Sequence, residues 1–139
     1  MEHEMTENEK KKWYLRGYER AVRQMQRSEL RIRELRLNRI CPAVIADGMP
    51  HTSGGSDLSD FAAELDREER KYMKARYLRV KLCREIMDKI ERLPNEDEKD
   101  VLTYRYIKLM KWEDICVEMN LSWRRIHYIH SDALEHFIL

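Results

Sequence analysis

The feature that most constrains the fold of this chain is the concentration of helix-breaking residues in one short segment. Residues 42–56, PAVIADGMPHTSGGS, hold two of the three prolines and three of the four glycines in the 139 residues. Since proline and glycine are the strongest local breakers, their scarcity elsewhere leaves long uninterrupted runs on both sides. A charged fraction of 38% with few β-branched runs favours helices over strands in those runs. The pattern predicts an all-α fold with a linker at residues 41–56.

The first run, from about Thr6 to Arg39, has apolar residues at helical spacing. The repeating positions are Tyr14, Tyr18, Ala21, Met25, Ile32 and Leu35. They lie three or four residues apart, or at the sum of these steps, which is the pattern of one continuous amphipathic helix. We expect this helix to end at Cys41-Pro42, because proline disfavours helical geometry in the residue before it.

The second run follows a repeat of 3.5 residues, the spacing of a coiled-coil seam. Its apolar members are Phe61, Leu65, Tyr72, Ala75, Leu82, Ile86 and Leu93, with polar interruptions at Glu68, Arg79 and Lys89. Either Ser56 or Asp57 can cap its start. Two long helices of similar length joined by a flexible linker predict a long antiparallel helical hairpin within residues 1–93.

A two-helix hairpin has a thin core and leaves apolar side chains on its second helix without cover. These are Met73, Tyr77, Val80 and Met87. They predict a homodimer, a higher oligomer or docking onto another protein, so that the hairpin serves oligomerisation or partner contact. The alternative is a monomer with ordinary exposed apolar residues.

The last third of the chain, residues 94–139, has helix breaks and helix caps at the spacing of a helix-turn-helix module. Leu93-Pro94-Asn95 breaks the second long helix, and Asn95 with Glu98 three residues later has the form of a capping box. A third helix then runs through Val101, Leu102, Tyr104 and Tyr106, and a fourth covers about Lys111 to Met119. A turn of three residues leads to Ser122, a good N-cap for a fifth helix over residues 122–138.

The faces of this last helix divide its residues into a core side and a solvent side. At 100° per residue, Ile129, Ala133 and Phe137 fall within about 60° of Ile126 and are expected to pack inward. The candidate DNA-binding residues are Trp123, Arg124, Arg125, His127, Tyr128 and Ser131. Arg124, His127, Tyr128 and Ser131 occupy the opposite side, with Trp123 and Arg125 on the flanks. Guanidinium, phenol, imidazole and hydroxyl groups hydrogen-bond base edges or phosphates, so the pattern indicates a DNA recognition helix.

The residues that carry this pattern resemble region 4 of sigma-70 family factors. The shared features are Pro94 at the head of a helix, the Arg105-Tyr106 pair, the Asp114-Ile115-Cys116 triplet, the serine cap Ser122 and the Ala133-Leu134 pair. Leu109 stands where the family often has glycine. The resemblance implies a region 4-like fold for about a third of the chain, and it implies that Arg124 and Tyr128 lie on the reading face. The whole architecture is similar to small phage-encoded transcriptional regulators of Gram-positive bacteria.

Charge is distributed unevenly along the chain. Residues 1–41 carry 11 Lys and Arg against 7 Asp and Glu, residues 42–93 carry 10 against 10, and residues 94–139 carry 6 against 9. Because the C-terminal module is acidic overall, its unspecific affinity for DNA is expected to be weak and salt-sensitive. Arg124 and Arg125 supply its local positive charge, and the basic first helix can assist.

Other kinds of site find little support in the sequence. His127 and His130 are three apart with His136 near, yet no matching carboxylate or cysteine completes a metal site, so solvated or half-packed histidines are the better interpretation. Adjacent Glu113 and Asp114 point in different directions on a helix, which favours helix electrostatics over acid-base catalysis. We therefore expect no metal, no cofactor and no enzymatic activity.

The cysteines and the hydropathy indicate the compartment. Cys41, Cys83 and Cys116 are far apart and odd in number, which is typical of reduced thiols. No apolar stretch long enough for a membrane span or a secretory signal is present, so we expect a cytoplasmic protein of the host bacterial cell, located at DNA.

Two functions remain open. In the first, the chain is a transcriptional regulator that binds double-stranded DNA through residues 122–138, with RNA polymerase as a further partner. In the second, it is an adaptor that contacts RNA polymerase or another protein without reading DNA sequence.

Overall fold

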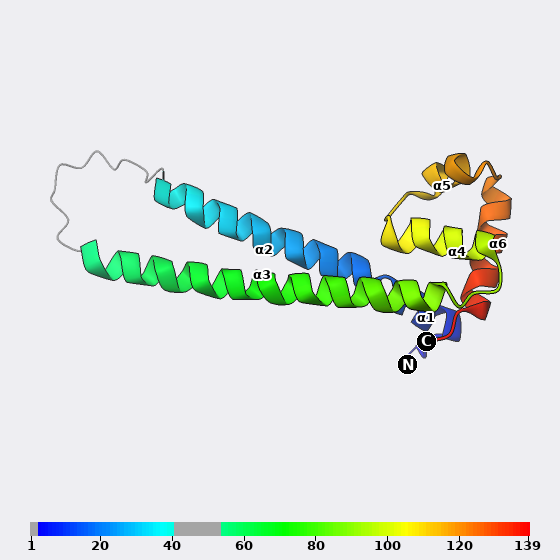
Figure 1. Ribbon diagram of the computed structural model, residues 1–139, viewed down its shortest axis with the longest axis horizontal. Helices are drawn as coiled ribbons and strands as arrows, with labels where there is room; N and C mark the ends of the chain where they lie inside the picture. Colours follow the sequence, from blue (N-terminus) through cyan, green and yellow to red (C-terminus); the bar gives the residue numbers. More distant parts are fainter. Residues whose placement is uncertain (1–2, 41–53) are drawn as a thin grey trace. The chain divides into compact units, whose positions relative to one another are not determined.

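The computed structural model describes residues 3–40 and 54–139, in which every regular element is helical (Figure 1). In chain order the elements are α1 (Glu7–Leu15), α2 (Gly17–Ile40), α3 (Gly54–Ile90), α4 (Glu96–Leu102), the π-helix η1 (Thr103–Ile107), α5 (Trp112–Met119) and α6 (Trp123–His136). The all-α prediction is confirmed for these residues. None of the helices in the described part combines the length and apolar character of a membrane span.

The predicted linker falls mostly on residues 41–53, which lie outside the described residues, together with the expected helix end at Cys41-Pro42. Helix α3 begins at Gly54, two positions before Ser56. Ser56 and Asp57, the two expected N-caps, therefore lie inside α3, which starts at least three residues earlier than either cap would imply.

Two compact units divide the chain. One contains residues 1–21 and 79–139 and the other contains residues 22–78, and α2 and α3 each extend through both. The first unit thus combines parts of the predicted hairpin, including residues 79–93, with the C-terminal segment.

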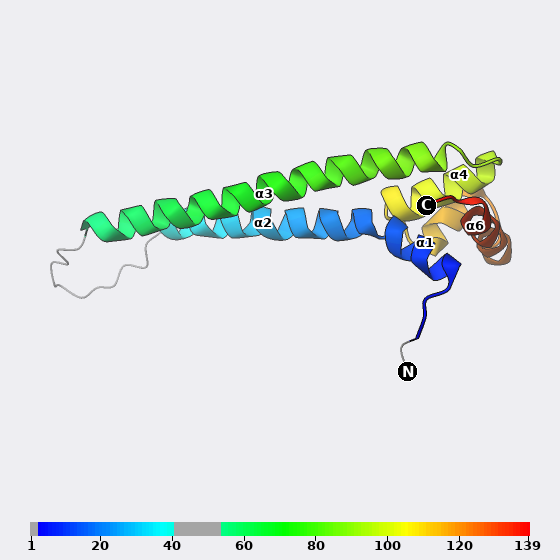
Figure 2. The ribbon, with the colours of Figure 1, turned by 90° about the horizontal axis from the view of Figure 1, so that it is seen from below.

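Within residues 22–78, α2 and α3 lie side by side (Figure 2). Arg36 Nη2 pairs with Glu69 Oε1 at 2.8 Å across the two helices. Glu68, which interrupts the apolar repeat of α3, is buried, and its Oε1 lies 3.3 Å from Arg31 Nη1 and 3.5 Å from Lys71 Nζ. Because an unpaired buried carboxylate is costly, these two cations explain how the repeat tolerates a charge at this position.

The run predicted as one helix from Thr6 to Arg39 is in fact two helices. Thr6 caps α1 in a full capping box with Glu9, and α1 ends at Leu15. Arg16 has φ −70° and ψ −9°, away from helical values near −63° and −42°. Gly17, which has low helix propensity, follows this bend. The second of the two helices keeps the predicted apolar face, since Tyr18 and Ala21 are buried at the start of α2.

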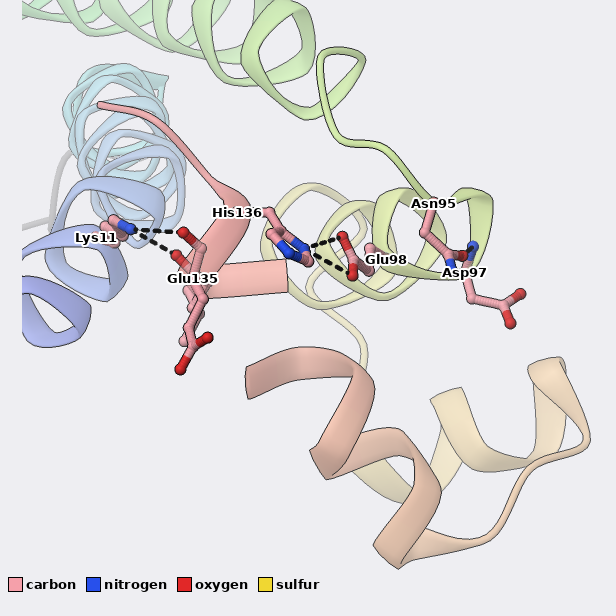
Figure 3. A network of polar contacts seen from close by, with 7 residues as sticks. Lys11, Asn95, Asp97, Glu98, Glu135 and His136 are labelled. Carbon is pink, nitrogen blue, oxygen red and sulfur yellow. Dashed lines mark hydrogen bonds and ion pairs between the residues drawn. The ribbon is translucent and has the colours of Figure 1, made fainter. Parts of the chain in front are cut away.

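The unit that contains the C-terminal helices is held together partly by α1 (Figure 3). Lys11 Nζ donates to the carbonyl oxygens of Leu134 at 2.7 Å and Glu135 at 3.3 Å, near the end of α6. A cation at the last carbonyls complements the helix dipole. In addition, the Tyr14 and Phe137 rings lie 6.1 Å apart, and Phe137 is fully buried. Residues more than 120 positions apart in the sequence therefore fix the end of α6.

Figure 3 also shows that the predicted Asn95–Glu98 capping box does not form. Asn95 does cap α4, where its Oδ1 accepts from the Asp97 backbone N–H at 2.8 Å. Glu98 is buried and instead holds His136, whose Nδ1 lies 3.0 Å from both carboxylate oxygens. This tertiary contact links α4 to the end of α6, and it takes the place of the bond that Glu98 would make to the Asn95 backbone in a capping box.

The predicted third helix continues past Leu102 but changes its hydrogen-bonding pattern. The Lys108 N–H donates to the Thr103 carbonyl at 2.9 Å, five residues back, which is the π-helical pattern of η1. Leu109 then adopts the left-handed region at φ 57°. A side chain with a Cβ is strained there, so this leucine ends the helix where glycine would do so at less cost.

Candidate nucleic-acid interface

The turn between α5 and α6 is built from local hydrogen bonds that end one helix and start the next. Asn120 lies in the left-handed region at φ 53° and ψ 46°. Its N–H donates to the Val117 carbonyl at 3.2 Å, and the Leu121 N–H donates to the Cys116 carbonyl at 3.1 Å. These two bonds are a Schellman motif, with asparagine in the position that glycine usually takes. The serine hydroxyl of Ser122 then accepts from the Arg125 N–H at 3.2 Å, and this bond caps α6.

The core side of α6 is largely as helical spacing predicts. Ile126, Ile129, Ala133 and Phe137 are all 5% exposed or less. Ile126 and Ile129 form a core cluster with Val101 and Ile115, and Leu121 from the turn packs against it. This core sets the rotation of α6 about its axis, so the opposite face is left to solvent.

Five of the six candidate DNA-binding residues line one open hollow of about 370 Å³ on the solvent side of α6. They are Trp123, Arg124, His127, Tyr128 and Ser131. Trp123 and Tyr128 are 51% and 54% exposed, respectively, and Arg124 and Ser131 are also exposed. Arg125 is exposed but does not line the hollow, which agrees with its expected place on the flank.

Arg124 is oriented by the tyrosine one turn later. Its Nη2 donates to the Tyr128 hydroxyl at 3.4 Å, and its Cζ lies 5.6 Å from the centre of the Tyr128 ring. Although an exposed contact of this kind adds little stability, it restricts the rotamers of a long side chain. The guanidinium is therefore held beside the hollow.

His127 is more enclosed than the sequence predicts. Its ring lies between two tryptophans, with centroids 4.5 Å from Trp123 and 4.8 Å from Trp112. Its Nε2 is buried and makes no hydrogen bond within the described part of the chain. The Arg105 guanidinium in turn lies 4.6 Å from the Trp112 ring centre. Trp112 and Arg105 thus pack behind His127, and this arrangement follows from tertiary packing that no local sequence pattern indicates.

His130 belongs to the core and not to the solvent side. It is 7% exposed, and its Nε2 lies 2.8 Å from the Tyr106 hydroxyl. Burial, assisted by the nearby charge of Lys12, lowers the pKa of His130 from 6.5 to about 4. Burial likewise raises the pKa of Tyr106. Both side chains are therefore neutral at pH 7, and the sequence signal for this position is its spacing of four from Ile126.

Across residues 3–40 and 54–139, no group of three or more His, Cys, Asp or Glu side chains is arranged to hold a metal ion. Glu113 and Asp114 lie in the first turn of α5, where negative charge complements the helix dipole.

What the geometry offers is a short capped helix, set by a tight turn, that presents aromatic, cationic and hydroxyl groups to solvent from one face. No family model, curated protein or solved structure matches this chain.

Proposed function

We propose that this protein is a phage-type transcriptional regulator that binds double-stranded DNA, with α6 as its recognition helix. In this proposal residues 94–139 form a three-helix, sigma region 4-like helix-turn-helix module, and residues 1–93 form an antiparallel hairpin for dimerisation or contact with RNA polymerase. It acts in the cytoplasm of the host bacterial cell.

The observation that carries the proposal is the gathering of reading groups on the exposed side of α6. Five predicted side chains line one hollow, while the apolar side of the helix is buried in the core. Recognition helices approach base edges with residues of their N-terminal turns, and Trp123, Arg124, His127 and Tyr128 come from the first two turns of α6.

Electrostatics support a weak and local attraction to phosphate. Residues 94–139 carry three more acidic than basic side chains, so the module as a whole repels DNA. Arg124 and Arg125 stand at the N-terminus of α6, and its partial positive charge adds to theirs. Affinity should therefore depend on these two residues and on low ionic strength.

The adaptor function remains the second candidate because apolar side chains are also exposed near the module. Val117 on α5 is 82% exposed, and Val80 and Met87 on α3 are 52% and 44% exposed. Such residues serve contact with a protein such as RNA polymerase better than contact with DNA.

The test compares Arg124→Ala, Arg125→Ala and wild type in mobility-shift assays at several salt concentrations, with duplexes selected from a random library. Loss of a bidentate guanine contact by Arg124→Ala should cost about 1–3 kcal/mol of binding free energy and relax sequence preference. Loss of a phosphate contact by Arg125→Ala should weaken all sequences alike and lower the salt slope by about one.

Arg67→Ala is the matched control, since Arg67 is an exposed arginine on α3. All variants should melt within about 0.5 kcal/mol of wild type, because none removes a core contact. If Arg124→Ala folds normally and binds the selected DNA with unchanged affinity and salt dependence, the adaptor function should replace the proposal.

A further inference from the structure

Two aromatic side chains form walls of the hollow on α6, although aromatic rings are not needed for hydrogen bonds to DNA. Trp123 and Tyr128 are both about half exposed and line it together. Large exposed aromatic rings cost free energy in water, and here they flank the position of a guanidinium. The hollow therefore suits a ligand that has an apolar group next to a hydrogen-bond acceptor.

The tryptophan wall is fixed before any ligand binds. Trp123 packs on His127, which packs on Trp112, with ring centroids 4.5 Å and 4.8 Å apart. Trp112 is held in turn by the Arg105 guanidinium at 4.6 Å and by contact with the core cluster. A wall supported in this way loses little conformational freedom on binding, which favours specific recognition.

Base-pair edges in the major groove offer one apolar group, the 5-methyl of thymine, whereas their other distinguishing groups are hydrogen-bond donors or acceptors. We propose that the hollow between Trp123 and Tyr128 binds the 5-methyl group of a thymine, beside a guanine that Arg124 contacts. This inference rests on the proposed DNA-binding function and names the base chemistry that the same site recognises.

The guanidinium is placed for the second half of this recognition. Arg124 lines the same hollow and is oriented by the Tyr128 hydroxyl at 3.4 Å. Guanine presents two acceptors, O6 and N7, to a planar guanidinium. Arg124 and the aromatic walls thus read neighbouring bases by different chemistry, and each half can be removed alone.

The experiment replaces thymine by uracil, which removes the methyl group and nothing else. A duplex selected by the wild-type protein is remade with uracil at each thymine in turn, and its dissociation constant is measured by fluorescence anisotropy. Wild type should lose about four-fold in affinity at one or two positions, the equivalent of one buried methyl group. Replacing a cytosine by 5-methylcytosine at those positions, with its guanine partner, should recover affinity relative to unmodified cytosine.

The variants separate the two halves. Trp123→Ala should bind thymine and uracil duplexes within about 1.5-fold of each other, whereas Arg124→Ala should keep the difference between thymine and uracil and lose its guanine preference. Arg67→Ala should behave as wild type. If Trp123→Ala melts early, Trp123→Leu keeps apolar volume at the start of α6 and should still show a reduced difference.

The outcomes distinguish failure of the inference from failure of the proposed function. Binding that depends on Arg124 but is insensitive to uracil at every position overturns the thymine site alone. If no DNA sequence is selected from the library, both the thymine site and the proposed DNA-binding function are overturned. The hollow then serves to bind an apolar side chain of a protein partner. A thymine preference that Trp123→Ala and Trp123→Leu both retain in full would also refute the assignment.

Discussion

Acidification should destabilise this protein through His130. The side chain is buried and its pKa is lowered to about 4, whereas in the unfolded chain the pKa is the ordinary 6.5. At a pH between these two values, His130 is protonated in the unfolded state but neutral in the folded state. The free energy of unfolding therefore decreases as the pH falls through this window. The difference in pKa corresponds to about 3 kcal/mol, with a slope of up to about 1.4 kcal/mol per pH unit. Above pH 6.5 this contribution is constant.

The measurement is urea unfolding, followed by circular dichroism between about pH 7 and 4.5, for wild type and His130→Gln. Glutamine can hydrogen-bond Tyr106 but does not titrate, so the stability difference between the two proteins should shrink as the pH falls. Titration of carboxylates affects both proteins alike and cancels. Tyr106→Phe is the matched control, because it removes the 2.8 Å hydrogen bond yet leaves His130 buried, and should keep most of the slope. Parallel curves for wild type and His130→Gln would show that His130 does not stay neutral in the folded protein.

Four shorter predictions concern stability and assembly. Asn120→Ala should lose about 1 kcal/mol of unfolding free energy and Asn120→Gly much less, because only the alanine is strained at φ 53°; equal losses by chemical denaturation would contradict the Schellman turn. Leu109→Gly should be more stable than Leu109→Ala by about 0.5–1 kcal/mol for the same reason, after the entropy of glycine in the unfolded chain is subtracted. His136→Ala should cost about 1–3 kcal/mol by leaving buried Glu98 unpaired, and adding Glu98→Gln should restore part of it in a double-mutant cycle. Sedimentation at micromolar concentration should show a species larger than 17.0 kDa, and Met87→Lys should reduce it; a monomer throughout would remove the oligomer.

Local patterns predicted those features that depend on neighbours in the sequence. Ser122 is the cap of α6, and the buried face of that helix begins at Ile126, both as its spacing indicates. A serine before an apolar-periodic run caps the helix by accepting a hydrogen bond from the backbone N–H three residues later. Because both partners lie within this short segment, the sequence alone can indicate the cap. The exposure of Trp123 and Tyr128 then follows from the same helical periodicity.

Structural features that depend on residues far apart in the sequence were not predicted from local patterns. Glu98 at N3 of α4 is a good candidate for a capping box, but it pairs with His136, which lies 38 positions later. The bend at Arg16 likewise interrupts a stripe whose spacing remains helical throughout. Because several tertiary contacts together outweigh a local preference of about 1 kcal/mol, such choices are decided by packing that periodicity does not encode.

The polar interruptions of the α3 repeat illustrate what such packing adds. Arg79 Nε lies 3.4 Å from the Tyr18 hydroxyl, and the Lys89 Nζ lies 4.2 Å from the centre of the Tyr14 ring. A slip of one heptad along α3 would preserve an apolar seam, yet it would separate both cations from their aromatic partners. Polar residues within a seam specify register at some expense in stability, since wrong registers leave them desolvated and unpaired. The residues that weaken the coiled-coil pattern in the sequence are thus the ones that distinguish one register of packing from another in the fold.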